Sequence, residues 1–338
     1  MTKSECSSLR GYAIMAIMLH NYCHWIPKAA RENEFCFDAD RTVYFLNSII
    51  STDFFIHFFS FMGHLGVPIF VFLSGYGLSK KYDSDDNLDY KSFLACHYLK
   101  LFKPLVIGTA IFLLVIVLKY GVFACSIPRL MLQCTMTFNL VYPYEQQVIP
   151  RAYWYFGMAM ELYLLYISIV YKHSIKILLL ITLLSLVVTI LLGINYVCSS
   201  ILIWFKYNAF GWLLPFFLGV YLSRNPVKTI SKGWKLFGLF LFSWLLFFCN
   251  YHYITWIFIP LNVVFFAMFL IQLHPSWLLD KTAAFGKLSL YIFVVHPIVR
   301  EVTLPIGVNT MPYLGLTIYV ALSLLISFIF YYFIEYKE

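Results

Sequence analysis

The chain has 338 residues, of which 62% are hydrophobic and only 12% are charged, and its mean hydropathy is +0.79. Soluble domains carry about 25% charged residues, so this chain lacks the polar surface that a soluble fold of this length needs. Its apolar residues run in unbroken stretches of about twenty rather than alternating, which argues against a membrane β-barrel. The composition therefore predicts an all-α polytopic membrane protein.

Ten apolar segments are long enough, or nearly long enough, to cross a membrane, because a span needs about 20 residues. We expect them to form about ten transmembrane helices in a single domain over residues 1–338. Their approximate ranges are 8–27, 54–78, 104–119, 152–171, 174–193, 203–223, 234–249, 254–273, 284–304 and 313–334.

The distribution of positive charge predicts the orientation. Sixteen of the 24 Lys and Arg residues fall at the two termini and in every second loop, and cytoplasmic loops are the ones that collect Lys and Arg. Both termini and Lys228 are therefore expected in the cytoplasm, and Arg31 and Arg129 outside. The net charge of +8 is then a property of these loops and gives no reason to expect a nucleic-acid partner.

One cytoplasmic segment and the cysteines add two further expectations. Residues 90–103 have the spacing of an amphipathic helix that lies on the membrane surface with a basic face. The eight cysteines form no C-x-x-C pair, so we expect most of them to be small apolar residues in helices. The sequence leaves open whether any outer cysteines are paired.

The first apolar segment carries an unusual set of polar residues. Arg10, His20, Asn21 and His24 lie on one side of a helix, and ionisable residues inside a membrane are costly enough to suggest a function. His20 and His24 also have the i, i+4 spacing of a metal-binding pair. No third ligand is evident nearby in the sequence, so no metal site is expected.

Two other segments place polar residues at the same predicted depth. His57 and His64 fall in the outer half of the second segment, and His296 and Arg300 in the outer half of the ninth. This shared depth with the histidines of the first segment predicts one polar cavity. Glu161 lies near the middle of the fourth segment, where a carboxylate must be paired or protonated. The sequence leaves open whether its role is structural or functional.

Five motifs, in order along the chain, resemble those of the integral-membrane acyltransferase family 3, which includes bacterial O-acetyltransferases of surface glycans. Ser74 and Gly75, in the second of them, are expected to pack closely at a helix interface rather than to act in the chemistry. The motifs are Leu9–His20, Gly66–Leu78, Tyr153–Tyr166, Leu214–Gly219 and Phe285–His296.

The resemblance departs from the family at one position. The family typically places its histidine eleven residues after the arginine, and here that position is Asn21. His20 comes one residue earlier and His24 three residues later. The resemblance implies a histidine general base, for which His20 is the first candidate and His24 the rival.

The resemblance also implies a substrate pair. No cofactor is expected to stay bound; acetyl-CoA or another acyl-CoA would be the co-substrate, with its phosphates at Arg10 and at Lys100 or Lys103. The acceptor would be a hydroxyl of an extracytoplasmic glycan or lipid-linked sugar, and His296 or Arg300 would stabilise the oxyanion or orient the base. Such a protein would lie in a cell membrane, as in bacterial inner membranes.

Two other functions fit the same composition. A glycan transporter or flippase would use the polar cavity without chemistry, but it would show inverted repeats, which are not evident. A non-catalytic component of polysaccharide export would not need histidines deep in the first segment. The oligomeric state is not indicated by the sequence.

Overall fold

The computed structural model describes residues 1–121, 123, 125–141, 148–194, 196–226, 230–309 and 311–335. Within these ranges the chain is built from helices and loops and has no strand, which confirms the all-α fold class. The helices are α1 (Lys3–Cys23), α2 (Ala39–Asn47), α3 (Phe54–Met62), α4 (Gly66–Tyr82), α5 (Tyr90–Tyr120), α6 (Ile127–Thr135), α7 (Trp154–Leu165), α8 (Ile175–Ile194), α9 (Ser200–Tyr207), α10 (Leu213–Arg224), α11 (Lys232–Phe248), α12 (Tyr253–Trp256), α13 (Ile259–Leu273), α14 (Ser276–Lys287), α15 (Ser289–Asn309) and α16 (Pro312–Glu335).

All ten predicted segments are helical, but fewer qualify as spans by length and composition. Among the described residues, seven helices are long and apolar enough to cross a membrane. An eighth span is possible if α9 and the helical stretch Ala209–Arg224, which includes α10 and is bent from α9 by 75°, cross the membrane together. The other two predicted segments correspond to α13, which has only 15 residues, and to α1, whose polar residues lower its hydropathy. The protein is thus a multi-pass integral membrane protein.

Residues 90–103 are helical, as expected, but they do not form a helix of their own. These residues are the first part of α5, which continues without a break to Tyr120. His97 does not face a surface: its ring lies 4.3 Å from that of Tyr163, and its Nε2 is 3.2 Å from the hydroxyl of Tyr82. Lys228 and the last three residues of the chain lie outside the described residues.

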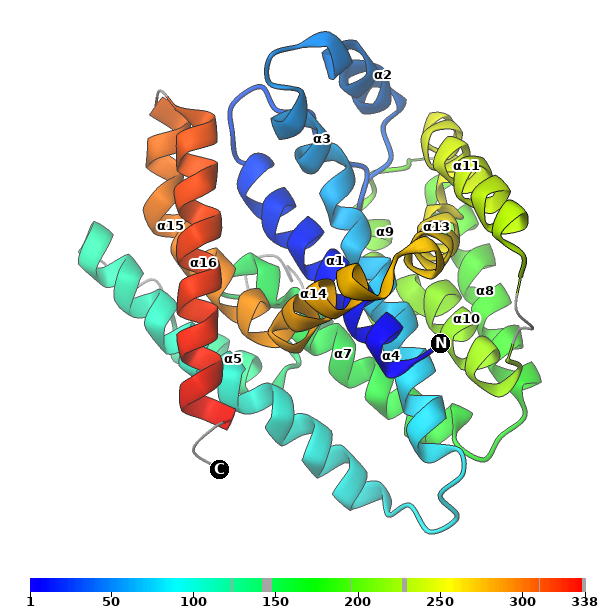
Figure 1. The fold of residues 1–338 in the computed structure, drawn as a ribbon. Coiled ribbons are helices and arrows are strands. Elements are labelled where there is room, and N and C mark those ends of the chain that lie inside the picture. The colour runs from blue at the N-terminus through cyan, green and yellow to red at the C-terminus, as the bar shows by residue number, and fades with distance from the viewer. Residues whose placement is uncertain are drawn as a thin grey trace.

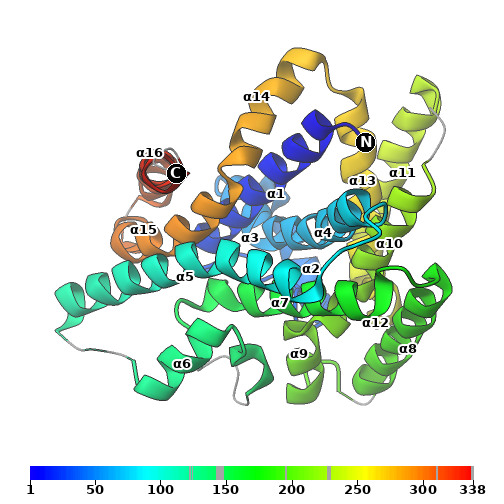
Figure 2. The ribbon, with the colours of Figure 1, turned by 90° about the horizontal axis from the view of Figure 1, so that it is seen from below.

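Helix α1 lies at the centre of the fold and packs against α14, α4, α3 and α15 (Figures 1 and 2). Two glycines allow the close approach of α1 and α14: a Cβ on Gly11 would collide with the carbonyl oxygen of Thr282, and one on Gly286 with the carbonyl oxygen of Ser7. The hydroxyls of Ser8 and Thr282 meet at the same contact. Small residues are what membrane helices use to pack closely, and here they hold α1 in place.

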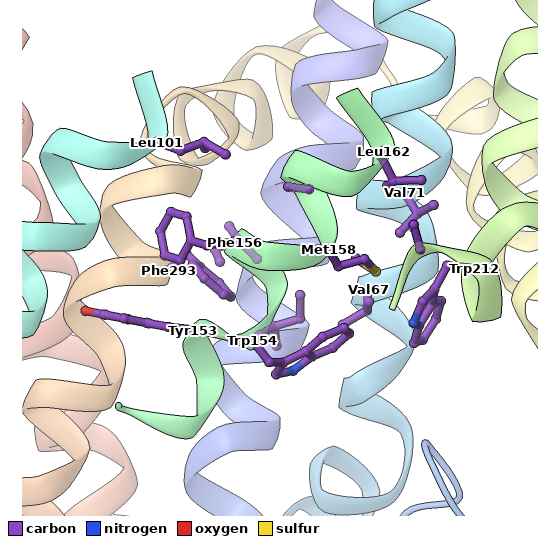
Figure 3. Close-up of a cluster of buried hydrophobic side chains, with 14 of the residues drawn as sticks. Val67, Val71, Leu101, Tyr153, Trp154, Phe156, Met158, Leu162, Trp212 and Phe293 are labelled. Carbon is purple, nitrogen blue, oxygen red and sulfur yellow. The ribbon is translucent and has the colours of Figure 1, made fainter. Parts of the chain in front are cut away.

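An aromatic cluster on α7 fills the space between α1, α4, α10 and α15 (Figure 3). Trp154 stacks on Trp212 at 6.0 Å, and Phe156 meets Phe293 edge to face at 5.4 Å. The buried hydroxyl of Tyr153 donates to the carbonyl oxygen of Val294, 2.7 Å away. Tyr153 therefore ties the start of α7 to the middle of α15, the helix that carries His296.

Candidate functional site

Three histidines meet where α1 ends. The ring of His20 lies 5.3 Å from that of His24 and 5.8 Å from that of His64, which belongs to the short 3₁₀ helix Gly63–Leu65 between α3 and α4. His20 and His64 are each only 8% exposed. The three imidazoles thus lie side by side, and two of them are shielded from bulk solvent.

The contact that His20 makes to the backbone determines which of its nitrogens carries the proton. Nδ1 of His20 lies 2.9 Å from the carbonyl oxygen of Ser60, which can only accept a hydrogen bond. Nδ1 is therefore protonated, and in the neutral ring Nε2 keeps its lone pair. In this tautomer the lone pair of Nε2 can accept a hydrogen bond from a hydroxyl group.

His24 has two charged partners from the loop that follows α1. Its Nδ1 lies 2.5 Å from Oε2 of Glu32, and its Nε2 lies 3.0 Å from Nη1 of Arg31. Arg31 can only donate, so Nε2 of His24 accepts and Nδ1 donates its proton to Glu32. Glu32 is thus the carboxylate of a close His–Glu ion pair, and no motif in the sequence points to it.

The loop carrying Glu32 is fixed to distant parts of the chain by three contacts. Cys36 forms a disulfide with Cys198, which precedes α9 and is 162 positions away. Lys206 donates to the carbonyl oxygen of Glu34 at 2.8 Å, and the indole of Trp256 donates to that of Asn33 at 2.6 Å. These two cysteines therefore do not behave as small apolar helix residues. Both lie in loops predicted to be extracytoplasmic, where disulfides persist.

Two carboxyl groups of this loop are driven to opposite charge states. Burial tends to raise the pKa of Glu32, but the hydrogen bond from His24 and the charges of the nearby imidazoles hold that pKa well below its usual range. Burial raises the pKa of Glu34 well above its ordinary value, and the negative charge of Glu32 raises it further. Glu32 is therefore the ionised member of the pair and Glu34 the neutral one.

His296 and Arg300 lie on α15, on another side of the same region. His296 is fully buried; its Nδ1 bonds to the carbonyl oxygen of Ile292 at 3.0 Å. Nη1 of Arg300 lies 3.4 Å from Oδ1 of Asn21, and its guanidinium carbon lies 5.1 Å from the ring centre of Trp25. Arg300 and Asn21 thus link α15 to α1, and neither contacts an imidazole of the cluster through a hydrogen bond found among the described residues.

Three buried imidazole nitrogens here form no hydrogen bond among the described residues. Nδ1 of His24 still has Oε2 of Glu32 at 2.5 Å, whereas Nδ1 of His64 and Nε2 of His296 have no such neighbour. Buried polar atoms are nearly always paired, so such atoms are most often explained by a water, an ion or a ligand. They are the two positions where an incoming polar group would find partners.

Three of the predicted polar residues make contacts away from this cluster. The backbone nitrogen of Ala30 donates to Nδ1 of His57, which places that histidine in the loop contacts. Glu161 accepts from the backbone nitrogen of Ala209 at 2.6 Å and so caps the bend before α10. The hydroxyl of Ser74 donates within α4, and a Cβ on its neighbour Gly75 would collide with the backbone of α10.

The cations near the other end of α1 are accessible. Arg10 is exposed and lies close enough to Tyr155 and Tyr163 of the α7 region for its charge to act on both phenols. Lys100 and Lys103 are exposed on α5 and line a hollow of about 540 Å³ shared with α15 and α16. These residues do not form one cluster with the histidines, since ten residues of helix separate Arg10 from His20, a rise of about 15 Å.

The chain as a whole matches a known protein family. A family model described as an acyltransferase domain, that of acyltransferase family 3, matches residues 7–332. The chain belongs to acyltransferase family 3. No curated protein and no solved structure matches it. It is therefore a membrane acyltransferase of this family, as the five motifs indicated.

The structure explains why several motif residues of this acyltransferase are glycine. Gly11 and Gly286, from the first and last motifs, form the α1–α14 contact, and Gly66 brings α4 against the backbone of α1 at Ala13. Gly219 packs in the same way against the carbonyl oxygen of Phe72. These glycines fix the position of α1 and hence of His20.

Glu32 is also a possible third metal ligand beside His20 and His24. One donor atom each from His20, His24 and Glu32 lie within 4.8 Å of one another, so the third ligand that the sequence did not reveal is present in space. The hydrogen bond from Arg31 nevertheless leaves the proton of His24 on Nδ1, directed at Glu32.

Proposed function

We propose that this acyltransferase is an O-acyltransferase that moves an acetyl group from cytoplasmic acetyl-CoA to a hydroxyl of an extracytoplasmic glycan or lipid-linked sugar, with His20 as the general base. The observation that carries the proposal is the bond from Nδ1 of His20 to the carbonyl oxygen of Ser60. It leaves the lone pair of Nε2 available in a shielded site, as the deprotonation of a hydroxyl requires.

The donor would enter from the opposite end of α1. Arg10 is exposed there, and a guanidinium suits the phosphates of a CoA. Lys100 and Lys103 offer further positive charge along α5. The rise of about 15 Å between Arg10 and His20 is the distance that an extended pantetheine arm would have to bridge.

The acceptor would be bound on the histidine side. The unpaired Nδ1 of His64 and Nε2 of His296 offer partners for its hydroxyl groups or for the thioester oxygen. Arg300 contributes a buried positive charge behind them, which favours the negative charge that develops on that oxygen.

The test uses the purified protein in detergent, with acetyl-CoA labelled in the acetyl group. Wild-type protein is expected to consume the donor and to label a glycan or lipid-linked sugar acceptor. His20→Ala is expected to reduce this transfer by about 10²–10⁴-fold while CoA binding is retained. Absence of donor consumption by the wild type, or full activity of His20→Ala, would contradict the proposal; a transporter would show no donor consumption.

A further inference from the structure

We propose that Glu32 is a positioning residue for this transfer: its carboxylate orients His24 and stabilises the positive charge that His20 acquires when it takes the acceptor proton. The inference rests on the proposed function. Glu32 lies outside the predicted spans and outside the five motifs, so the proposed function alone does not include it.

Glu32 contacts one imidazole directly and lies near a second. Its Oε2 lies 2.5 Å from Nδ1 of His24, and the donor atoms of Glu32, His20 and His24 lie within 4.8 Å of one another. At that separation, in a poorly hydrated site, an anion strongly favours a protonated imidazole. A carboxylate that receives an imidazole N–H and faces the base is the arrangement by which enzymes orient and charge-stabilise a histidine.

The proton and electron balance of the step is complete without a further reactant. The acceptor hydroxyl gives its proton to Nε2 of His20 while its oxygen bonds to the thioester carbon. The tetrahedral intermediate then collapses, the carbon–sulfur bond breaks, and the CoA sulfur leaves with the electron pair and takes the proton from His20. Between these two events His20 is a cation, and Glu32 is the anion within 4.8 Å of it.

Contacts with distant parts of the chain restrict the loop and so fix the position of Glu32. The disulfide at Cys36, the bond from Trp256 to Asn33 and the bond from Lys206 to Glu34 hold three of the four residues that follow Glu32. A carboxylate placed by such contacts loses little freedom when it binds an imidazole. The loop therefore presents Glu32 as a preorganised partner of the histidines.

Several charged or titratable groups face this cluster from the surrounding elements. They are His20 and His24 from α1, Arg31 and Glu34 from the loop, His64 before α4, Lys206 from α9, and His296 and Arg300 from α15.

The chain supplies a matched control two residues away. Glu34 is buried where Glu32 is only partly buried, and its raised pKa makes it neutral, so Glu34→Gln replaces a neutral group with one of the same size and charge. Glu32→Gln has the same change in atoms but removes a negative charge. If only the size of the side chain mattered, Glu32→Gln and Glu34→Gln would have the same transfer activity.

The experiment measures acetyl transfer by Glu32→Gln, Glu32→Asp and Glu34→Gln across pH, with thermal unfolding in the same detergent as a check of folding. Glu32→Gln is expected to lower kcat by about 10-fold to 10²-fold with little change in KM for acetyl-CoA. The acid limb of its pH–rate profile is expected to move to lower pH by about 1–3 units, because His20 loses the anion that favours its protonation. Glu34→Gln should keep the wild-type profile, and Glu32→Asp should recover part of the rate.

An unshifted pH profile in Glu32→Gln, with the wild type active, would overturn the role of Glu32 and leave the proposed function standing. A fall in kcat equal to that of Glu34→Gln would do the same. If Glu32→Gln does not fold, the profile of Glu32→Asp decides, because a displaced carboxylate must still shift the acid limb. Inactive wild-type protein would instead contradict the proposed function itself. Metal found in wild type and lost in Glu32→Gln would overturn the proton-binding role in favour of a metal site.

Discussion

A Cβ on Gly63 would lie 2.6 Å from the Cβ of His20 and 2.6 Å from the carbonyl oxygen of Ala16. Both neighbours belong to α1, and neither is the flexible end of a side chain. Gly63 therefore determines how closely the segment carrying His64 approaches the helix carrying His20.

Gly63→Ala should disable the acyltransferase without removing any functional group. The added methyl must displace α1 or the α3–α4 connection, and a displacement of about 1 Å at the reacting groups is enough to cost on the order of 10²-fold in rate. The measurement is acetyl transfer by protein that inserts normally in the membrane. Gly77→Ala is the control, because a Cβ there meets nothing within 4 Å. Equal, wild-type activity of both variants would show that the close contact is not needed.

The Cys36–Cys198 disulfide should support activity although neither cysteine belongs to the histidine cluster. Replacing both Cys36 and Cys198 by serine releases the loop that positions Glu32, so acetyl transfer should fall by about 10-fold or more. Loss of a native disulfide typically costs about 2–4 kcal/mol, so the unfolding temperature should fall as well. Cys125→Ser, which changes a free cysteine, is the control. Unchanged transfer in the double variant would separate the loop from catalysis.

The fold could be predicted from the sequence to the extent that it depends on apolar runs. All ten segments became helices because in lipid every backbone group must be bonded within the chain. The sequence did not show that the helix of the span 104–119 begins as early as Tyr90. Basic residues next to a span give the same pattern whether the helix ends there or continues. The bend of 75° falls at Asn208, where Lys206 and Asn208 interrupt the apolar run, but the segment was expected to be a single span.

The site was predicted only where it lies on helices. The depth of His20, His64 and His296 could be counted along their spans, and the structure brings the first two together. Glu32 could not be found in this way, because a loop residue is placed by contacts such as the Cys36–Cys198 bond, which joins positions 162 residues apart. The length of the loop gives no indication of that pairing.

The orientation predicts which positions a membrane-impermeant thiol reagent reaches. A single cysteine replacing Arg129 should be labelled in intact cells, and one replacing Asn87 should be labelled only after permeabilisation. The Cys36–Cys198 pair should be kept in the background protein, since removing it loosens the outer loop. The control is the same protein with all free cysteines replaced and none added. Labelling of position 87 in intact cells would invert the assignment of the α4–α5 connection.

Arg10 should govern donor affinity rather than the chemical step. Arg10→Ala should weaken CoA binding by about 10-fold or more, because a hydrogen bond to a charged group is worth about 1.5–3 kcal/mol. Arg10→Lys should recover part of it, since an ammonium keeps the charge but not the guanidinium fork. Calorimetry with CoA measures this directly, with dephosphorylated pantetheine as the ligand that should not distinguish the variants. Normal CoA affinity in Arg10→Ala would reassign the residue to topology or helix anchoring.

The two histidines of α1 should differ in the severity of their loss. His20→Ala removes the proposed base and should reduce acetyl transfer by about 10²–10⁴-fold, with CoA binding and membrane insertion intact. His24→Ala should be milder, because Nε2 of His24 is already taken by Arg31 and the carboxylate of Glu32 remains within reach of His20. Both variants must be assayed side by side, as the family spacing falls between the two positions. An inactive His24→Ala with an active His20→Ala would exchange their roles. Wild-type transfer in both would move the search for the base to His296, whose Nε2 is buried and unpaired among the described residues.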